Sequence, residues 1–337
     1  MNTEYSFFVG IDVSKRKLDL AWLHEGKIRS KVIENSPRGY ADLQDWLVAH
    51  GAAPAQTHLC LEATGPYGDG VATALADALW PVSVVNPARI KGFAQSELAR
   101  NKNDRADAAL LARFCAALNP VLWQAPSVQW RALRAKVERL QVLKEMHQQE
   151  SNRLEAHQVS QEVLQAKSVS EHLAWLDKKI AALETDIDDH IDRHPELKQD
   201  AELIESIPGI ARTTAAKVLA YLGDVRRFHS AKALAAYVGV CPRERVSGSS
   251  VRGRTMISRA GNASIRHALY MPGMVALRHN PILKTFGERL LASGHAPKAV
   301  IGAAMRKLVH MIYGIVRSGV PFRADFCSQK LDFQDGI

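Results

Sequence analysis

The change in apolar periodicity near residue 125 constrains the fold of this chain most. Before it, short apolar runs at Phe7–Ile11, Leu18–Leu23 and His58–Leu61 have the length of β-strands. From Trp130 onward strand patterns vanish and apolar residues recur at spacings of three and four, as at Leu173, Leu176, Ile180, Leu183, Ile187 and Ile191. A chain of 337 residues also exceeds the usual size of one domain. We therefore predict two globular units and a helical connector.

The first 125 residues predict a mixed sheet covered by helices. The polar Ser14–Lys17 segment separates the first two apolar runs, as in a β-hairpin, and Lys31–Glu34 predicts a third strand. Further along, Leu43–Leu47 predicts a helix and Val82–Val85 another strand, and a helix through Leu75 and Leu79 precedes that strand. A hairpin followed by alternating strands and helices is typical of an α/β or α+β layer fold.

The connector contains a second apolar stripe, formed by Leu133, Val137, Leu140 and Met146. The two stripes either pack against each other as an antiparallel hairpin or serve self-association, and the two uses are compatible. His194-Pro195 ends this helical region.

The second unit is predicted to be mainly helical and to open with a helix-hairpin-helix. Ile207-Pro208-Gly209-Ile210 lies between two helical patterns and leads into Thr213 and Thr214 at a helix start. Backbone N–H groups at such a start can meet a phosphate. An ordinary turn between helices is the alternative.

Basic residues concentrate in the last third of the chain. The formal net charge is +9, and from Arg226 to Arg323 there are 17 Lys and Arg against two acids, Glu244 and Glu288. This distribution indicates a polyanionic partner for the C-terminal unit.

Cysteine spacing and hydropathy exclude several classes of protein. The four cysteines are far apart without a C-x-x-C spacing, which argues against a zinc knuckle and a disulfide framework. No apolar run approaches the roughly 18 residues of a membrane span. We expect a soluble bacterial cytoplasmic protein with reduced thiols and no membrane partner.

Four carboxylates stand where a sheet and a helix can bring them together. Asp12 and Glu62 each end a predicted strand, and a spacing of three puts Asp104 and Asp107 on one face of a helix. Such hard oxygen donors suit Mg²⁺, and two ions about 4 Å apart can assist in-line displacement at a phosphate. Each acid by itself could be a solvated surface residue or an acid favoured at the start of a helix. The hypothesis of phosphodiester chemistry therefore rests on the four acids taken together.

A phosphate loop of the kind found in sugar kinases and actin-like ATPases is the competing interpretation of Gly10–Lys15. That fold needs a second phosphate loop, and no convincing glycine-rich partner follows. A highly basic C-terminal third is also unusual for a small-molecule kinase.

The segment Arg243–Arg254 is typical of a loop and is dense in hydroxyl and guanidinium groups. A serine there could attack a phosphorus while arginines stabilise the developing charge. Chemistry alone does not choose among Ser247, Ser249 and Ser250, and a loop serine is usually a solvated or turn-capping hydroxyl. Arg259, Arg266 and the pair Arg306-Lys307 further along look like backbone clamps, with a solvated basic face as the alternative.

The motifs together resemble the insertion-sequence transposases of the IS110 family, also called DEDD transposases or bridge-RNA-guided recombinases. The resemblance runs nearly end to end. It is carried by Phe8–Val13, Leu61–Gly65, Asn86-Pro87, Asn101–Ala108, Ser206–Ile210, Ser247–Ser250, Arg259–Asn262 and Arg266–Pro272.

This resemblance implies a RuvC-like, RNase H-like catalytic domain over residues 1–128, a coiled coil over 129–198, a serine-bearing transposase domain over 199–325 and a tail over 326–337. It implies that a DEDD quartet binds Mg²⁺ and acts in catalysis, and that the first serine of the S-G-S-S element, Ser247, is the nucleophile. The quartet positions are Asp12, Glu62, Asp104 and Asp107. Neither these four residues nor Ser247 departs from the family pattern.

The resemblance also implies partners. They are donor and target DNA, a structured bridge RNA that pairs with both, and further copies of the chain in a dimer of dimers. Residues expected to contact nucleic acid are Lys102, Arg105, Gly209, Thr213, Arg245, Ser249, Ser250, Arg252, Arg254, Arg259, Asn262 and Arg266.

Two rival functions remain. In a metal-only nuclease, water attacks and the serines only bind phosphate, so no protein stays attached to DNA. A non-catalytic DNA- and RNA-binding protein of the same fold would function unchanged when its carboxylates are removed.

Overall fold

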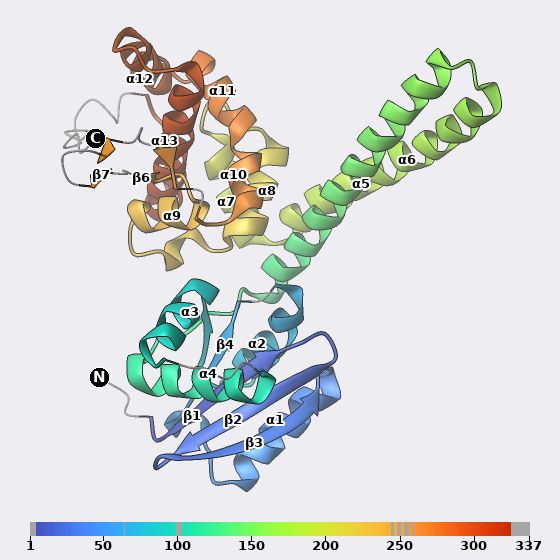
Figure 1. Cartoon of the computed structure of the whole chain (residues 1–337). Coiled ribbons are helices and arrows are strands. Elements are labelled where there is room, and N and C mark those ends of the chain that lie inside the picture. Colours follow the sequence, from blue (N-terminus) through green and yellow to red (C-terminus); the bar gives the residue numbers. More distant parts are fainter. Residues whose placement is uncertain are drawn as a thin grey trace. The chain divides into compact units, whose positions relative to one another are not determined.

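The computed structural model describes residues 5–63, 65–98, 103–243, 246–247, 251–252, 256–258 and 260–324. The chain forms two compact units, Met1–Ala125 and Pro126–Ile337 (Figure 1). The helical connector belongs to the second unit. Its residues Trp130, Leu133, Ile187 and Ile191 are buried in the same core as the C-terminal helices, which explains why it forms no unit of its own.

The first unit is built on a five-stranded sheet in the order β3-β2-β1-β4-β5. β1, β2 and β3 form an antiparallel meander, and β4 and β5 run parallel to β1. The predicted hairpin and mixed sheet are thus confirmed. The strands are β1 Phe7–Val13, β2 Lys17–His24, β3 Lys27–Glu34, β4 Thr57–Glu62 and β5 Val82–Val85.

Helices cover both faces of this sheet. α1 (Pro37–Ala49) and α2 (Pro66–Asp77) bury Leu43, Leu47 and Leu75 against one face. α3 (Pro87–Ser96) and α4 (Asp104–Leu118) pack on the other face, where Phe114 of α4 is fully buried (Figure 1). The helix expected to reach Leu79 ends at Asp77, because Leu79 has a φ of 65° that leaves the helical region.

Small residues let α4 lie directly on β1. A Cβ at Gly10 would come within 2.0 Å of the Ala108 carbonyl oxygen and 2.4 Å of the Ala112 backbone nitrogen. Ala21 of β2 is fully buried against the same two alanines. The absence of side-chain bulk therefore fixes how closely the start of α4 approaches the sheet.

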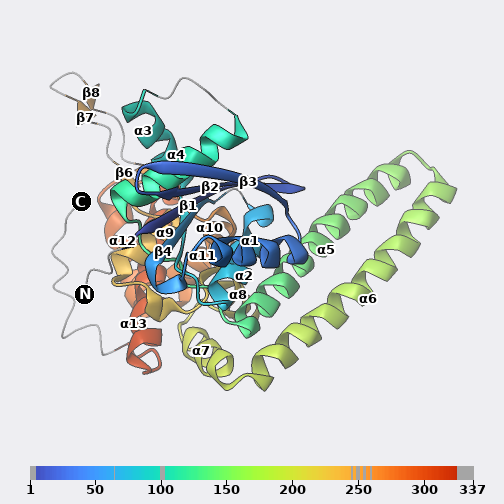
Figure 2. The same ribbon diagram turned by 90° about the horizontal axis from the view of Figure 1, so that it is seen from below.

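The second unit is mainly helical, as expected. Its first two helices, α5 (Val128–Val159) and α6 (Val163–Arg193), lie side by side in Figures 1 and 2. The ion pairs Lys136–Asp186 and Lys144–Glu184 show that they run antiparallel. The remaining helices are α7 Pro195–Glu205, α8 Arg212–Leu222, α9 Ala231–Val238, α10 Ala263–Ala268, α11 Tyr270–His279, α12 Pro281–Ala292 and α13 Pro297–Ser318.

The prediction of a loop over residues 243–254 is wrong at the described residues 243, 246–247 and 251–252. Two short antiparallel ladders lie there. β6 (Pro242–Arg243) pairs with β9 (Met256–Ile257), and β7 (Val246–Ser247) pairs with β8 (Val251–Arg252). Strands of two residues are too short to produce a period-two pattern in the sequence.

Among the described residues one helix, α13, is long and apolar enough to span a membrane by length and composition alone, although charged residues interrupt its apolar runs. Its residues Val300, Ala304, Leu308, Ile312 and Val316 recur every four positions and are buried in the core of the second unit. A core helix of a globular domain has this pattern.

Candidate metal centre

The strands place two predicted acids on the sheet face that α4 covers. Asp12 follows Gly10 by two residues in β1, and Glu62 follows Cys60 by two residues in β4. Because side chains alternate along a strand, each acid shares a face with the residue two positions before it. Gly10 and Cys60 both pack against α4, so both carboxylates lie toward that helix.

The first turn of α4 supplies the other two predicted acids. The side chain of Asn103 caps the helix by accepting a hydrogen bond of 2.9 Å from the Ala106 backbone nitrogen. Asp104 and Asp107 follow in that first turn. The cap fixes where the helix begins, and the contact with Gly10 fixes where that start lies over the sheet.

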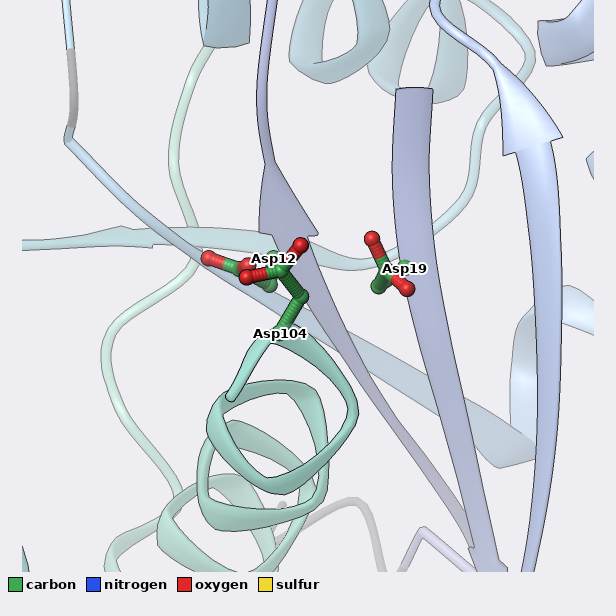
Figure 3. Close-up of side chains that lie close together, drawn as sticks. All are labelled: Asp12, Asp19 and Asp104. Atoms are coloured by element: carbon green, nitrogen blue, oxygen red, sulfur yellow. The ribbon is translucent and has the colours of Figure 1, made fainter. Parts of the chain in front are cut away.

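Three carboxylates come together at this place (Figure 3). One oxygen each of Asp12, Asp19 and Asp104 lie within 4.8 Å of one another. Asp12 and Asp104 were predicted, whereas Asp19 was not. Glu62 and Asp107 are not part of this closest group among the described residues.

Asp19 enters the site through the register of the β1–β2 hairpin, in which it lies directly opposite Asp12. Like charges directly opposite each other destabilise a hairpin. At an effective dielectric constant of about 20, two ionised carboxylates whose oxygens lie within 4.8 Å repel by about 3.5 kcal/mol or more. The signal was available in the sequence, because a turn centred on Lys15-Arg16 makes Asp12 and Asp19 partners.

Lys17 partly compensates this negative charge. Its Nζ donates a hydrogen bond of 2.7 Å to Asp104 Oδ2 and lies 3.0 Å from Asp19 Oδ2. The hydrogen bond from Lys17 holds the pKa of Asp104 below its usual value. The same two partners raise the pKa of the Lys17 ammonium.

Asp12 carries the largest electrostatic cost of the site. Burial, followed by the charges of Asp107, Asp104, Asp19 and Glu62 in that order, raises the pKa of Asp12 from 3.8 to about 6. The other three predicted acids therefore each act on Asp12 through their charge. A bound cation would reverse this effect by favouring the ionised carboxylate.

The donor atoms suit a hard divalent cation. Asp12, Asp19 and Asp104 offer only carboxylate oxygens, the ligands that such ions prefer. Asp19 is 6% exposed, and its Oδ2 lies 3.0 Å from Lys17 Nζ but accepts no hydrogen bond of good geometry from the described residues. Buried carboxylate oxygens are normally hydrogen-bonded, so this one fits a cation ligand.

Ser247 is the last residue of β7 and pairs with Val251 across the β7–β8 ladder. Residues 248–250 join the two strands, so the serine stands at the mouth of a hairpin. Only the backbone of Ser247 and Arg252 is described. Six other predicted residues lie outside the described residues, namely Lys102, Arg245, Ser249, Ser250, Arg254 and Arg259.

The turn between α7 and α8 has a packing role of its own. A Cβ at Gly209, whose φ is 107°, would come within 2.8 Å of the Ala276 Cα on α11. Thr213 is exposed at the start of α8. Beside it, Arg212 forms ion pairs with Asp188, Asp192 and Glu205. These carboxylates oppose a phosphate at this helix start, and phosphate binding there stays a prediction.

The other predicted nucleic-acid contacts have partners within the fold. Arg105 is exposed on α4 and donates a hydrogen bond of 3.1 Å to Ser30. Asn262 caps α10, and Arg266 donates a hydrogen bond of 3.2 Å to the Val238 carbonyl oxygen. Their described contacts are structural, and a role in DNA or RNA binding stays a prediction.

Known protein families match most of this chain. Residues 9–160 match a family described as "Transposase", the DEDD transposases of the IS110 type. Residues 201–288 match the family described as "Transposase IS116/IS110/IS902 family". The chain belongs to the IS110 family of transposases. The first match contains Asp12, Glu62, Asp104 and Asp107, and the second contains Ser247.

Curated relatives of this transposase include full-length matches. It is 32% identical over 316 residues to the pilin gene-inverting proteins of Moraxella lacunata and Moraxella bovis, covering 94% of this chain and 97% of theirs. It is 36% identical over 81 residues to the transposase for insertion sequence element IS1111A of Coxiella burnetii, covering 24% of this chain and 22% of that protein.

Among solved structures, Thermus thermophilus RuvC in complex with a Holliday junction substrate is similar with a TM-score of 0.26 and 18% identity. This likeness covers 33% of the transposase and 95% of RuvC, and it is too distant to support a functional argument.

Proposed function

We propose that this transposase cuts and rejoins DNA with Mg²⁺ held by Asp12, Glu62, Asp104 and Asp107 in an RNase H-like first unit. The observation that carries the proposal is the convergence of carboxylates where α4 begins over β1. Because these carboxylates repel one another, we infer that they are held close together in order to bind a cation. The fully oxygen donor set favours Mg²⁺ over softer metals.

Mg²⁺ in this centre would supply Lewis-acid stabilisation of charge on the scissile phosphate. The protein contributes a fixed geometry, because two strands and a capped helix start hold the carboxylates before any substrate binds. Preorganisation of this kind removes the cost of gathering the ligands during the reaction.

Ser247 is proposed as the nucleophile. Its Oγ would form a bond to the phosphorus while the bond from phosphorus to the leaving sugar oxygen breaks. The hydroxyl proton passes to a base, and the leaving oxygen takes up a proton. The phosphoserine link conserves the energy of the broken ester for strand exchange. Support comes from its place at a hairpin mouth within a strongly basic stretch.

A guide RNA fits the chemistry of the second unit. From Arg226 to Arg323 basic residues outnumber acids 17 to two, which suits contacts to phosphates rather than to particular bases. We propose that a structured bridge RNA encoded by the element pairs with donor and target DNA and supplies sequence specificity. The predicted contact residues in this unit would bind its backbone.

A dimer of dimers in the bacterial cytoplasm is proposed as the working form. The α5–α6 hairpin carries exposed apolar side chains at Val159, Val163, Leu164 and Trp175, where a second copy could pack. Such an assembly would let the metal centre of one protomer meet the serine of another.

DNA inversion is a second candidate for the biological outcome. It is favoured by the two relatives named pilin gene-inverting proteins, whose length this chain covers almost completely. Inversion and transposition share strand cleavage and joining, and they differ in how the two sites are arranged. A plasmid with two sites in inverted orientation and a pair of separate plasmids would distinguish them.

Covalent capture of DNA tests the proposed chemistry. The protein is incubated with Mg²⁺, RNA transcribed from the DNA flanking its gene, and labelled donor and target DNA, and denaturing gels then detect protein attached to DNA. We expect an adduct for the wild type and none for Ser247→Ala or Asp12→Asn. Ser160→Ala, which changes an exposed serine after α5, is the matched control and should behave as the wild type.

Each rival makes a different prediction in this assay. Cleaved DNA without an adduct would show a metal-only nuclease in which water attacks. Full adduct formation by Ser247→Ala would refute the serine assignment. DNA binding without cleavage, unchanged by Asp12→Asn, would favour a non-catalytic binding protein.

A further inference from the structure

The β1–β2 hairpin brings two like charges together, and the DEDD quartet accounts for Asp12 but not for the buried Asp19. Asp19 faces Asp12 across the hairpin and is 6% exposed. Its Oδ2 has an ion-pair partner but accepts no hydrogen bond of good geometry from the described residues. An ionised carboxylate in such surroundings needs a positive charge nearby, and a neutral side chain of the same size would avoid the cost.

Lys17 supplies that positive charge from the hairpin itself. Its Nζ bridges Asp19 and Asp104 at 3.0 and 2.7 Å, and thus ties β2 to the start of α4. The side chain is 44% exposed, so the ammonium can exchange its partners for water without unfolding the hairpin. It therefore occupies the edge of the carboxylate cluster as a displaceable cation.

We propose that Asp19 is a fifth carboxylate of the metal site and that Lys17 is a resident cation displaced by the divalent ion. The inference rests on the proposed function, since it requires that Asp12 and Asp104 bind the same ion. The oxygens of Asp12, Asp19 and Asp104 lie within 4.8 Å of one another, so one ion can contact all three after a small adjustment.

The exchange has a consequence for substrate binding. A divalent ion next to Asp104 repels the Lys17 ammonium, which then moves toward solvent at the same edge of the sheet. A phosphate brought to the metal would meet this released charge. The protein would hold its cluster together with Lys17 when no metal is bound and use the same side chain on DNA afterwards.

Direct measurement of metal binding tests both residues without any reaction. Mn²⁺ is titrated into the full-length protein, and free Mn²⁺ is followed by electron paramagnetic resonance. Asp19→Asn should weaken binding about tenfold or more, in the range found when groups around metal ligands are removed. Lys17→Gln should tighten binding on the order of tenfold, because a competing charge is lost. Asp42→Asn, an exposed change on α1, is the control.

The variants separate failure of this inference from failure of the proposed function. If Asp12→Asn abolishes binding while Asp19→Asn binds as the wild type, Asp19 is no ligand and the quartet stands. If Asp12→Asn also binds as the wild type, the proposed metal site itself is wrong. Weaker binding by Lys17→Gln would overturn the displacement, and a gain of affinity cannot arise from misfolding.

Amine labelling provides a second readout on the wild-type protein. Loss of its two carboxylate partners should make Lys17 react faster with an acylating reagent when Mg²⁺ is added, as measured by peptide mass spectrometry. Lys15 in the same turn is exposed and should react at an unchanged rate. Equal rates at Lys17 with and without Mg²⁺ would contradict the displacement.

Discussion

Replacing Asp12 by Asn should stabilise the metal-free first unit while destroying the metal centre. Burial and four neighbouring acids raise the pKa of Asp12 from 3.8 to about 6. A shift of that size corresponds to about 3 kcal/mol against the charged form. Because Asp12 is only partly buried and salt screens its neighbours, we reduce the expected gain for Asp12→Asn to about 1 to 2 kcal/mol at pH 8.

The sign of the effect follows from proton linkage. The folded state holds the Asp12 proton more tightly than the unfolded chain, so wild-type stability falls as the pH rises from about 4 to about 6. Above pH 6 the full penalty remains. The advantage of the Asn variant should therefore be present at pH 8 and vanish at pH 4.

Hydrogen exchange of peptides covering β1 and β2 measures this effect in the unit that contains the site. Saturating Mg²⁺ should reverse the order of stabilities, since Mg²⁺ at about a hundred times its dissociation constant stabilises the wild type by about 2.7 kcal/mol, more than the advantage of the Asn variant. Asp42→Asn controls for the loss of a surface charge. An Asn variant that exchanges as fast as or faster than the wild type at pH 8 without metal would refute the reasoning.

Three further predictions concern the packing of α4 on the sheet, the pH dependence of Mg²⁺ affinity and a buried ion pair. Gly10→Ala puts a methyl group 2.0 Å from a backbone oxygen of α4 and should lower the stability of the first unit by about 3 kcal/mol, whereas Gly92→Ala meets nothing within 4 Å. Calorimetry should show a lower melting temperature for the first variant only. Mg²⁺ affinity should fall about tenfold per pH unit below pH 6, because Asp12 must lose its proton to bind, and a flat profile in calorimetric titrations would contradict this. Arg226→Met leaves the buried Asp200 without its two hydrogen bonds and should cost about 3 to 5 kcal/mol in urea unfolding, part of which Asp200→Asn should restore in the double variant.

Much of the first unit was predictable from local patterns. Short apolar runs predicted β1 and β2, and the polar turn between them predicted the hairpin. The spacing of Asp104 and Asp107 placed both acids in the first turn of one helix. Edge strand β3 begins at Lys27, four residues before its predicted start, because an exposed edge strand carries little apolar pattern.

The second unit was less predictable where its elements are very short. The α5–α6 stripes were visible because they persist over many helical turns. The ladders around Ser247 were missed because two-residue strands carry no periodicity. The apolar stripes of α5 and α6 did not indicate that Trp130, Leu133, Ile187 and Ile191 would share a core with α8. Contacts between residues far apart in the chain leave no periodic pattern in the sequence.

The sequence by itself determined which residue types could build a metal site and at which ends of strands and helices they stand. Only the tertiary structure decided which of them meet. The close approach of α4 to Gly10 brings Asp104 to Asp12 and to Lys17, whereas the pairing of Asp12 with Asp19 already follows from the short turn between their strands. The physical reason is that propensity and periodicity act over a few residues, whereas a carboxylate cluster depends on packing between segments about 90 residues apart in the chain.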